Sequence, residues 1–185
     1  MSEWFETLDG LQERVWARLA MAALQSDLVT FATVSPDGEP EARTVVLRDA
    51  DPESGTLEIY TDLESAKVAS LRHQPRASVL LWDADLNLQI RAQSAVTVLT
   101  GDAVAERWDD VPDHSRFSYG MTPPPGNVIA ASDAYVKAPD QAVFAVLSCR
   151  VDTIDVVHLG TPHRRAGFRR DPSQGGDWVA NWLAP

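Results

Sequence analysis

Cysteine is almost absent from this 185-residue sequence, in which Cys149 is the only one. A single thiol cannot form an intrachain disulfide, and it suits a reducing compartment. The first residues, MSEWFETLDGLQERVW, lack the basic and apolar stretches of a secretory signal, and no apolar run reaches membrane-spanning length. We therefore expect a soluble, cytoplasmic protein, with Cys149 as a buried, inert thiol in the apolar stretch AVFAVLSC.

Positive charge is also scarce. The 16 Lys and Arg residues are outnumbered by 27 Asp and Glu residues, and the formal net charge is -11. Such a chain repels nucleic acid and anionic membrane surfaces, so we expect neither as a partner. A small anionic ligand held by a few local cations is compatible with this charge.

Two common ligand motifs are missing as well. The sequence has no glycine-rich phosphate loop. Its histidines show neither HExxH spacing nor a cysteine partner, so we expect no metal site. They are His73, His114, His158 and His163.

Length and composition favour a single domain over residues 1–185. With 44% hydrophobic residues the chain can bury one good core but hardly two. Residues 1–27 predict an amphipathic helix packed on that core, because apolar residues recur there at helical spacing. These residues are Leu8, Leu11, Val15, Leu19 and Ala22. Trp4, Phe5 and Trp16 should make this a packing helix.

Short strands rich in Val and Thr dominate the remainder. We expect strands at 28–35, 41–48, 56–61, 76–83, 87–100, 142–152, 154–160, 163–170 and 177–183, and helices at 65–75 and 101–110. The proline-rich stretch 120–127 predicts a flexible loop. Many short strands with few helices indicate a mainly β fold, a closed or nearly closed antiparallel barrel with peripheral helices.

Two arginines, Arg43 and Arg48, flank the apolar run 44–47 on one predicted strand. Arginine side chains form strong, charge-assisted hydrogen bonds with anionic groups such as phosphates and carboxylates. Because side chains alternate along a strand, the two should face opposite sides unless a bulge separates them. They are therefore expected to serve different ligands, or different parts of one.

Lys67 occupies the first turn of a predicted helix whose N-cap is Ser65. A lysine there opposes the helix dipole by roughly 0.3 to 1 kcal/mol. A phosphate would reverse that cost, since free N–H groups, a hydroxyl and an ammonium form an anion site. With Arg43 and Thr61 close in the predicted plan we favour this over a solvated surface lysine.

Several stretches in order, EPEARTVVLR, LEIYTDLESAKVASL, PRASVLLW, LQIRAQSAV and PHRRAGFRRD, resemble the pyridoxamine 5'-phosphate oxidase family. The resemblance covers residues 28–185 and is narrower for the family's oxidase-related FMN-binding members. It implies a Greek-key-like split β-barrel that is a homodimer, with FMN bound at the subunit interface.

The resemblance also implies site residues. The contacts to FMN would be Arg43, Thr44, Val45, Val46, Tyr60, Thr61, Ser65, Ala66, Lys67, Gln89 and Arg165. Ala66 stands where the family pattern has an arginine to the phosphate. Without the resemblance, Gln89 could be a solvent-facing strand residue, and Arg165 part of a basic edge that discourages strand pairing.

The substrate residues match less well. Arg48, Ser115 and His163 fit the family's substrate phosphate site, but Val111 stands in place of an arginine there. A second arginine is missing near Thr161, and residues 112–134 depart from the pattern and carry no predicted cofactor contact. We therefore expect an FMN-dependent oxidoreductase of another small substrate. The alternatives are an authentic pyridoxamine or pyridoxine 5'-phosphate oxidase, and a flavin- or haem-binding protein without turnover.

Overall fold

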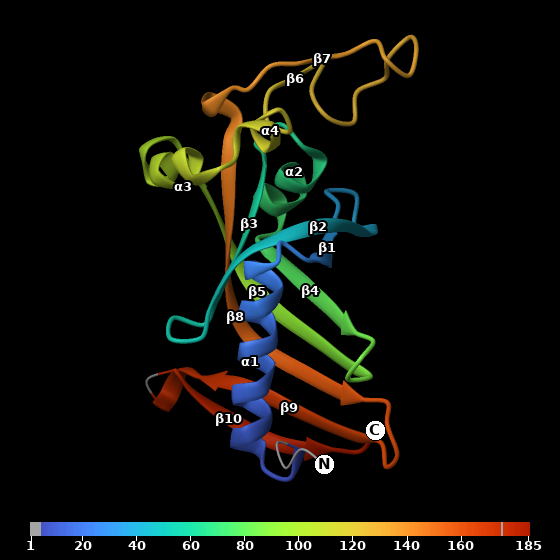
Figure 1. Ribbon diagram of the computed structural model, residues 1–185, viewed down its shortest axis with the longest axis vertical. Helices are drawn as coiled ribbons and strands as arrows, with labels where there is room; N and C mark the ends of the chain where they lie inside the picture. Colours follow the sequence, from blue (N-terminus) through green and yellow to red (C-terminus); the bar gives the residue numbers. More distant parts are fainter. Residues whose placement is uncertain (1–4, 175) are drawn as a thin grey trace.

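One long strand, β8 (Phe144–His158), runs along the molecule and joins its parts (Figure 1). The computed structural model describes residues 5–174 and 176–185, so Trp4 lies outside the described residues. Separate strands were expected at 142–152 and 154–160, which was wrong. A register shift between Gln93 and Ser94 of the paired strand absorbs Asp152 as a bulge, so β8 continues unbroken.

The β-strands close into an antiparallel barrel, which confirms the predicted mainly β split-barrel class. Its members are β1 (Leu28–Val34), β2 (Pro40–Asp51), β3 (Thr56–Asp62), β4 (Arg76–Asp83), β5 (Leu88–Thr100) and β8. They pair in the order β8, β3, β2, β1, β4, β5, and β5 pairs back to β8. Because the sheet closes on itself, each of these strands has a neighbour on both sides over at least part of its length.

Two further strands, β9 (Arg164–Asp171) and β10 (Asp177–Leu183), extend the sheet outside the barrel. The first half of β8 pairs with β3 and the second half with β9, while β5 pairs along the opposite edge throughout. β8 is therefore shared by the barrel and by an outer sheet of β5, β8, β9 and β10.

Helices cover the outside of the barrel. α1 (Leu8–Leu24) begins later than the expected 1–27, because Thr7 caps it by accepting a hydrogen bond from the Gly10 N–H at 3.1 Å. It buries Leu11, Val15, Trp16, Leu19 and Ala22. The other helical elements are α2 (Ala66–His73), η2 (Gly101–Val104), α3 (Ala105–Asp110), α4 (Asp113–Arg116), η3 (Gln141–Val143) and η4 (Pro172–Gln174). No helix within the described ranges has the length and apolar character needed to span a membrane.

The core fills the barrel and one end of it. Phe31, Leu57, Ile90 and Leu147 are fully buried inside the barrel, and a second cluster of Trp108, Tyr119 and Phe144 packs at the end near α3. Cys149 is also fully buried, as predicted, and burial raises the pKa of its thiol to about 12.

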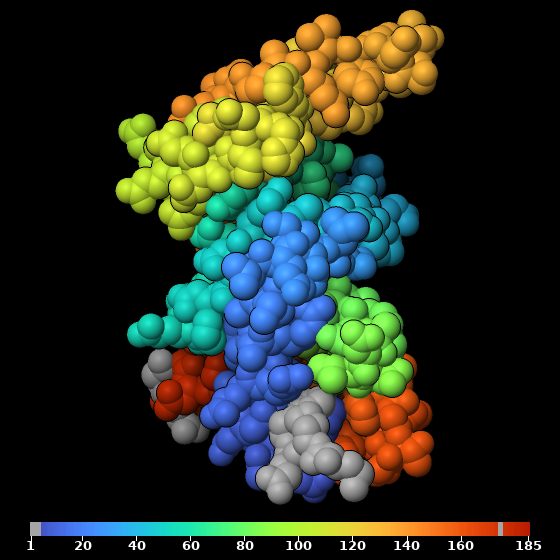
Figure 2. All heavy atoms as spheres, in the orientation of Figure 1, coloured from blue at the N-terminus to red at the C-terminus, as the bar shows by residue number. Residues whose placement is uncertain are grey.

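Residues 121–140 leave the barrel as an extended arm (Figures 1 and 2). Two short strands, β6 (Met121–Thr122) and β7 (Val136–Lys137), pair with each other and close the neck of this arm. The expected loop at 120–127 is therefore the first part of a longer excursion with a defined base.

Candidate functional site

A pocket of about 420 Å³ lies between β2, β3, the start of α2 and the neck of the arm. Most of the residues predicted from the sequence line it. These are Arg43, Thr44, Val45, Val46, Arg48, Tyr60, Thr61, Ser65 and Lys67. Residues from three separate stretches of the sequence, 43–48, 60–61 and 65–67, thus meet at one place.

Lys67 is a half-buried cation in the wall of this pocket. Its ammonium donates hydrogen bonds to Thr61 Oγ1 at 2.9 Å and to Ser65 Oγ at 3.1 Å, and it forms no ion pair within the described residues. Burial lowers the pKa of Lys67, and the positive charge of Arg43 lowers it further. Two cations that repel each other across a pocket would both be stabilised by an anion placed between them.

The start of α2 adds backbone donors to the same corner. Ser65 occupies the N-cap position, as predicted, but its side chain does not cap the helix. Its hydroxyl instead donates to the carbonyl oxygen of Asp62 at 2.7 Å and lies 3.3 Å from Thr61 Oγ1. The Val68 N–H donates to the Ser65 carbonyl oxygen at 2.9 Å, so the N–H groups of Ala66 and Lys67 are the ones that can bind an anion.

Arg43 is held firmly in the pocket wall. Its guanidinium donates to Thr33 Oγ1 at 2.7 Å, to Glu41 Oε2 at 2.8 Å and to the carbonyl oxygen of Phe31 at 3.2 Å. Glu41 partly neutralises this charge. Arg43 is thus oriented before any ligand binds, and its net contribution to an anion site is smaller than that of Lys67.

Arg48 lines the same pocket as Arg43 because β2 contains a bulge. The pairing of β2 with β3 shifts register between Leu47 and Asp49, and both Leu47 and Ala50 are buried. Plain alternation would have put the two arginines on opposite faces; the bulge that the sequence analysis named as the exception is present.

The guanidinium of Arg48 has no acidic partner in the described chain and hydrogen-bonds to the Tyr119 side chain. It donates to Ser26 Oγ at 3.4 Å and lies 5.8 Å from the centre of the Tyr60 ring. It forms no ion pair in the part of the chain that the structure describes. Arg48 also lines a second pocket of about 210 Å³, together with Asp110 and Val111.

Gln89 and Arg165 lie elsewhere, on the outer sheet. Both flank Val157 of β8, one on β5 and one on β9, so they share one face. Thr61, in the pocket, pairs with Ala145, and Val157 is 12 residues further along β8, about 40 Å of strand. Neither residue lines the pocket of Lys67.

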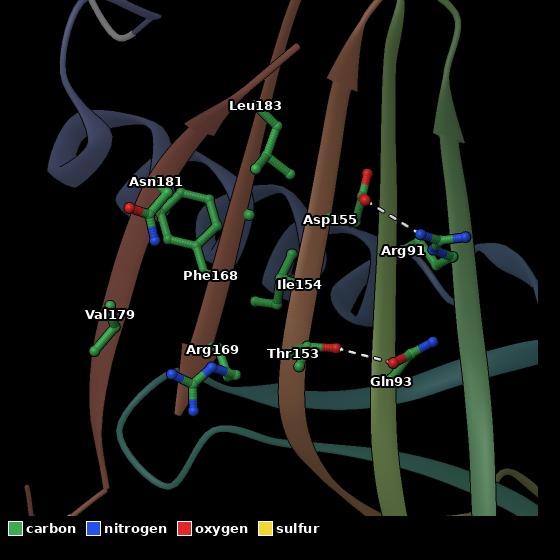
Figure 3. A pocket seen from close by; sticks show the side chains of 11 residues that line it. Arg91, Gln93, Thr153, Ile154, Asp155, Phe168, Arg169, Val179, Asn181 and Leu183 are labelled. Atoms are coloured by element: carbon green, nitrogen blue, oxygen red, sulfur yellow. Dashed lines mark hydrogen bonds and ion pairs between the residues drawn. The ribbon is translucent and has the colours of Figure 1, made fainter. Parts of the chain in front are cut away.

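Arg165 is fixed by Asp155, which it contacts at 2.7 Å. Asp155 also accepts a hydrogen bond from Arg91 at 3.1 Å, which Figure 3 shows. The pairing with Asp155 raises the pKa of Arg165. Arg91 and Arg165 therefore share one carboxylate on this face, whereas Lys67 in the pocket has no ion pair within the described residues.

Comparison with known proteins identifies the family to which this chain belongs. The sequence profile described as "Pyridoxamine 5'-phosphate oxidase, FMN-binding domain" matches residues 1–100. The chain belongs to the pyridoxamine 5'-phosphate oxidase family. The cofactor of the matched domain is FMN.

Curated relatives match over part of their length. A pyridoxine/pyridoxamine 5'-phosphate oxidase from Gloeothece citriformis is 40% identical over 88 residues, which are 46% of this chain and 40% of the relative. One from Azorhizobium caulinodans is 31% identical over 149 residues, 79% of this chain and 64% of the relative. The chain thus spans about two-fifths of the length of the first of these relatives.

Solved structures agree on the fold. An oxidase-related, FMN-binding protein from Nostoc punctiforme has a TM-score of 0.76 at 23% identity and covers 94% of this chain and 95% of its own. PhzG from Burkholderia lata, solved in complex with tetrahydrophenazine-1-carboxylic acid, also reaches 0.76, at 18% identity, with 100% and 97% covered. Both support the split barrel.

The residues of the pocket fit a phosphorylated flavin. A half-buried lysine without an ion pair in the described chain and an uncapped helix start supply the charge and donors that a phosphate needs. Thr44, Val45 and Val46 form the adjoining wall along β2. Ala66 begins α2 but does not line the pocket, and in place of the family's arginine it adds no side-chain donor.

The predicted substrate residues are dispersed. Arg48 lines the pocket, whereas Ser115 lies on α4 and His163 in the exposed turn before β9, and neither reaches the pocket wall. The departures from the family pattern at Val111 and near Thr161 lie close to these two positions in the sequence.

Sequence reasoning missed the part of the wall that comes from 118–137. Ser118, Tyr119, Met121, Pro125 and Lys137 line the pocket. They are brought there by the Gly120 N–H, which donates to Asp62 Oδ2 at 3.0 Å. This stretch shows no helical or strand periodicity, so only the glycine and the prolines hinted at a defined turn.

Proposed function

We propose that this protein is an FMN-dependent oxidoreductase that acts on a small substrate, with the flavin phosphate bound by Lys67, Ser65 and the start of α2. The supporting observation is the half-buried Lys67 ammonium, which has two hydroxyl partners and no ion pair in the described chain, although the Asp62 carboxylate lines the same pocket. In an acidic protein, such a cation is costly to bury unless an anion binds it.

The remaining pocket residues would orient the cofactor and the substrate. FMN supplies hydride transfer at its ring when it is bound. The β2 wall of Thr44 to Val46 would position the ring and exclude water, and Arg43 would stay in place through its contacts with Thr33 and Glu41. Arg48, which has no ion pair, would hold an anionic group of the substrate.

We further propose a homodimer in which each site draws on both chains. About 40 Å of strand separate the pocket from Gln89 and Arg165, so these residues could contact the same flavin only from a second copy. A two-fold axis that brings the outer sheet of one copy to the pocket of the other would complete two identical sites.

The site is a poor match for vitamin B6 phosphate, although the curated relatives carry that oxidase name. The small pocket beside Arg48 contains the buried, apolar Val111 and the carboxylate of Asp110. One guanidinium beside a carboxylate suits a singly charged group better than a phosphate dianion. An authentic pyridoxamine or pyridoxine 5'-phosphate oxidase is therefore the second candidate.

A spectrum and one assay test these alternatives. We expect the purified protein to show flavin absorption bands, and chemical reduction to bleach them. Hydrogen peroxide release should stay at background with pyridoxamine or pyridoxine 5'-phosphate. A Soret band would refute the FMN proposal, and sustained peroxide release with these substrates would establish the second candidate instead.

A further inference from the structure

The arm exposes apolar side chains to solvent. Every residue from 126 to 140 is exposed, including Val128 at 99%, Val136 at 66% and Tyr135 at 39%. Only three charged residues occur in this stretch, Asp133, Lys137 and Asp140. Long solvated loops are usually polar, so a long apolar one indicates a binding surface.

The neck holds this arm away from the barrel (Figures 1 and 2). The β6–β7 pairing is extended by a hydrogen bond from the Ala138 N–H to the Gly120 carbonyl oxygen at 3.1 Å. Gly120 has a φ of +105°, and a Cβ there would lie 2.1 Å from the Ala138 oxygen, so only glycine fits. An exposed apolar segment on a fixed base is suited to binding another molecule.

The outer sheet carries a groove of about 330 Å³ (Figure 3). Gly167 lies in the lining of this groove and has no side chain to fill it. It pairs with Asp155 on one side and with Asn181 on the other. Val179 and Leu183 provide apolar walls, and the exposed Arg169 lies at one end, with no ion pair within residues 5–174 and 176–185. The groove thus combines apolar surface with an available cation.

We propose that the arm of one copy of this chain docks in the outer-sheet groove of a second copy. The inference rests on the shared site proposed above. The neck lines the flavin pocket through Met121 and Lys137, and Arg165 lies two residues from Gly167 on the same face of β9. If a partner's Arg165 completes the pocket, the partner's groove lies beside the neck.

Charge supports the same occupant. The chain has a net charge of -11, so two copies repel each other unless apolar contacts and local pairing compensate. The arm supplies Val128 and Val136 for the apolar walls and Asp133 for the partner's Arg169. The two arms of a two-fold dimer would then each clasp the other copy.

Inter-chain cross-linking tests the contact directly. Chains with Val128→Cys and tagged chains with Val179→Cys would be mixed, allowed to exchange subunits and oxidised. We expect a disulfide-linked pair containing one chain of each kind, since the native Cys149 is buried and cannot interfere. Val128→Cys mixed with Ser54→Cys, an exposed position in the β2–β3 turn, serves as the matched control.

Two further variants keep the test independent of one disulfide. Gly167→Leu should fill the groove, and Val128→Ser with Val136→Ser should remove the apolar arm contacts. Each should weaken the dimer about tenfold or more, the effect of exposing roughly one buried valine. Sedimentation over a range of protein concentration measures this, with FMN titrated into the same samples.

The outcomes separate the arm contact from the proposed function. A dimer that binds FMN but cross-links no better through residue 179 than through residue 54 overturns the arm contact and leaves the function standing. Arm and groove variants with unchanged dimer affinity overturn it as well. A monomeric wild type with full FMN affinity removes the shared site on which the contact depends.

Discussion

The proposed flavin pocket and the outer sheet face hold the cations that we expect to contact the flavin in different ways. In the pocket, Lys67 has only hydroxyl partners and Arg48 has hydroxyl contacts and an aromatic ring. On the outer face, Arg91 and Arg165 share the carboxylate of Asp155. An unpaired buried cation is costly in the free protein and is stabilised by an anionic ligand, whereas a paired cation gains a fixed direction.

Lys67 and Arg165 both match FMN contacts of the family, but this difference predicts separate roles for them. The pocket should recognise the charge of a ligand, since two of its cations, Lys67 and Arg48, form no ion pair in the part of the chain that the structure describes. The outer face should position a donor, because Asp155 already balances part of the charge of its arginines. Phosphorylated and unphosphorylated flavins offer a way to tell the two tasks apart.

The largest expected effect is that of Lys67→Ala. It removes an ammonium from the proposed phosphate site, and a charge-assisted hydrogen bond contributes roughly 1.5 to 3 kcal/mol. FMN should therefore bind about 10- to 100-fold more weakly, while riboflavin binding stays nearly constant. Flavin fluorescence titration measures both. Arg72→Ala, an exposed cation on the same helix, is the control, and equal losses for FMN and riboflavin would sink the phosphate assignment.

The same variant can test the shared site by complementation. In a mixed dimer of Lys67→Ala and Arg165→Ala chains, one site carries both lesions and the other carries neither. Random mixing should thus restore about one tight site for every four chains. If each site is built from one chain, no tight site returns on mixing.

FMN affinity should fall at alkaline pH, and earlier than for an ordinary lysine. Burial and Arg43 lower the pKa of Lys67 in the folded protein, so the ammonium is present below that pKa and lost as the pH rises through it. Affinity should decline before the usual lysine value of about 10.4 is reached. Over the same window the apoprotein should become more stable, because the unfolded chain retains the proton longer.

Titration of FMN and riboflavin across this pH range checks the direction. The phosphate dependence should disappear as Lys67 deprotonates, so the two affinities should converge. The Lys67→Ala variant should show no such convergence. Riboflavin affinity that falls in parallel with FMN would point to a different titrating group.

A smaller effect is expected for Asp155→Asn on the outer face. Arg165 would lose its ionic partner and adopt several orientations, so a ring contact should weaken a few-fold. FMN and riboflavin should lose affinity equally, because the phosphate is not involved. Asp152→Asn removes a carboxylate that pairs with Arg76 and Arg150 on the same region of β8, and should change neither. A selective loss of FMN would contradict the division of tasks.

Local patterns in the sequence predicted most strands but not their irregularities. The strand at 76–83 has the expected limits, since Arg76 follows Pro75 and an acidic turn follows Asp83. The bulge at Arg48 and the continuity of β8 through Asp152 depend on how neighbouring strands pair, which alternation alone does not determine.

The site was predictable where its residues are close in sequence. Thr61, Ser65 and Lys67 come together through one strand and the helix after it, and their types suggest an anion. The wall formed by Tyr119 and Lys137 depends on the contact between Gly120 and Asp62, which are 58 residues apart. No local pattern reports such a contact, nor does one reveal that Arg165 lies far from the pocket.

The smallest effect is expected at Cys149, on the strand that joins the two regions. Its thiol is fully buried in the core between β3 and β5, and burial raises its pKa to about 12, so no thiolate forms near neutral pH. A thiol reagent such as a disulfide-forming dye should therefore label the native protein no faster than it unfolds. Labelling should be complete in denaturant. Fast native labelling that also weakens FMN binding would mean that β8 opens between the pocket and the outer sheet, and the two regions could then not be treated as parts of one rigid frame.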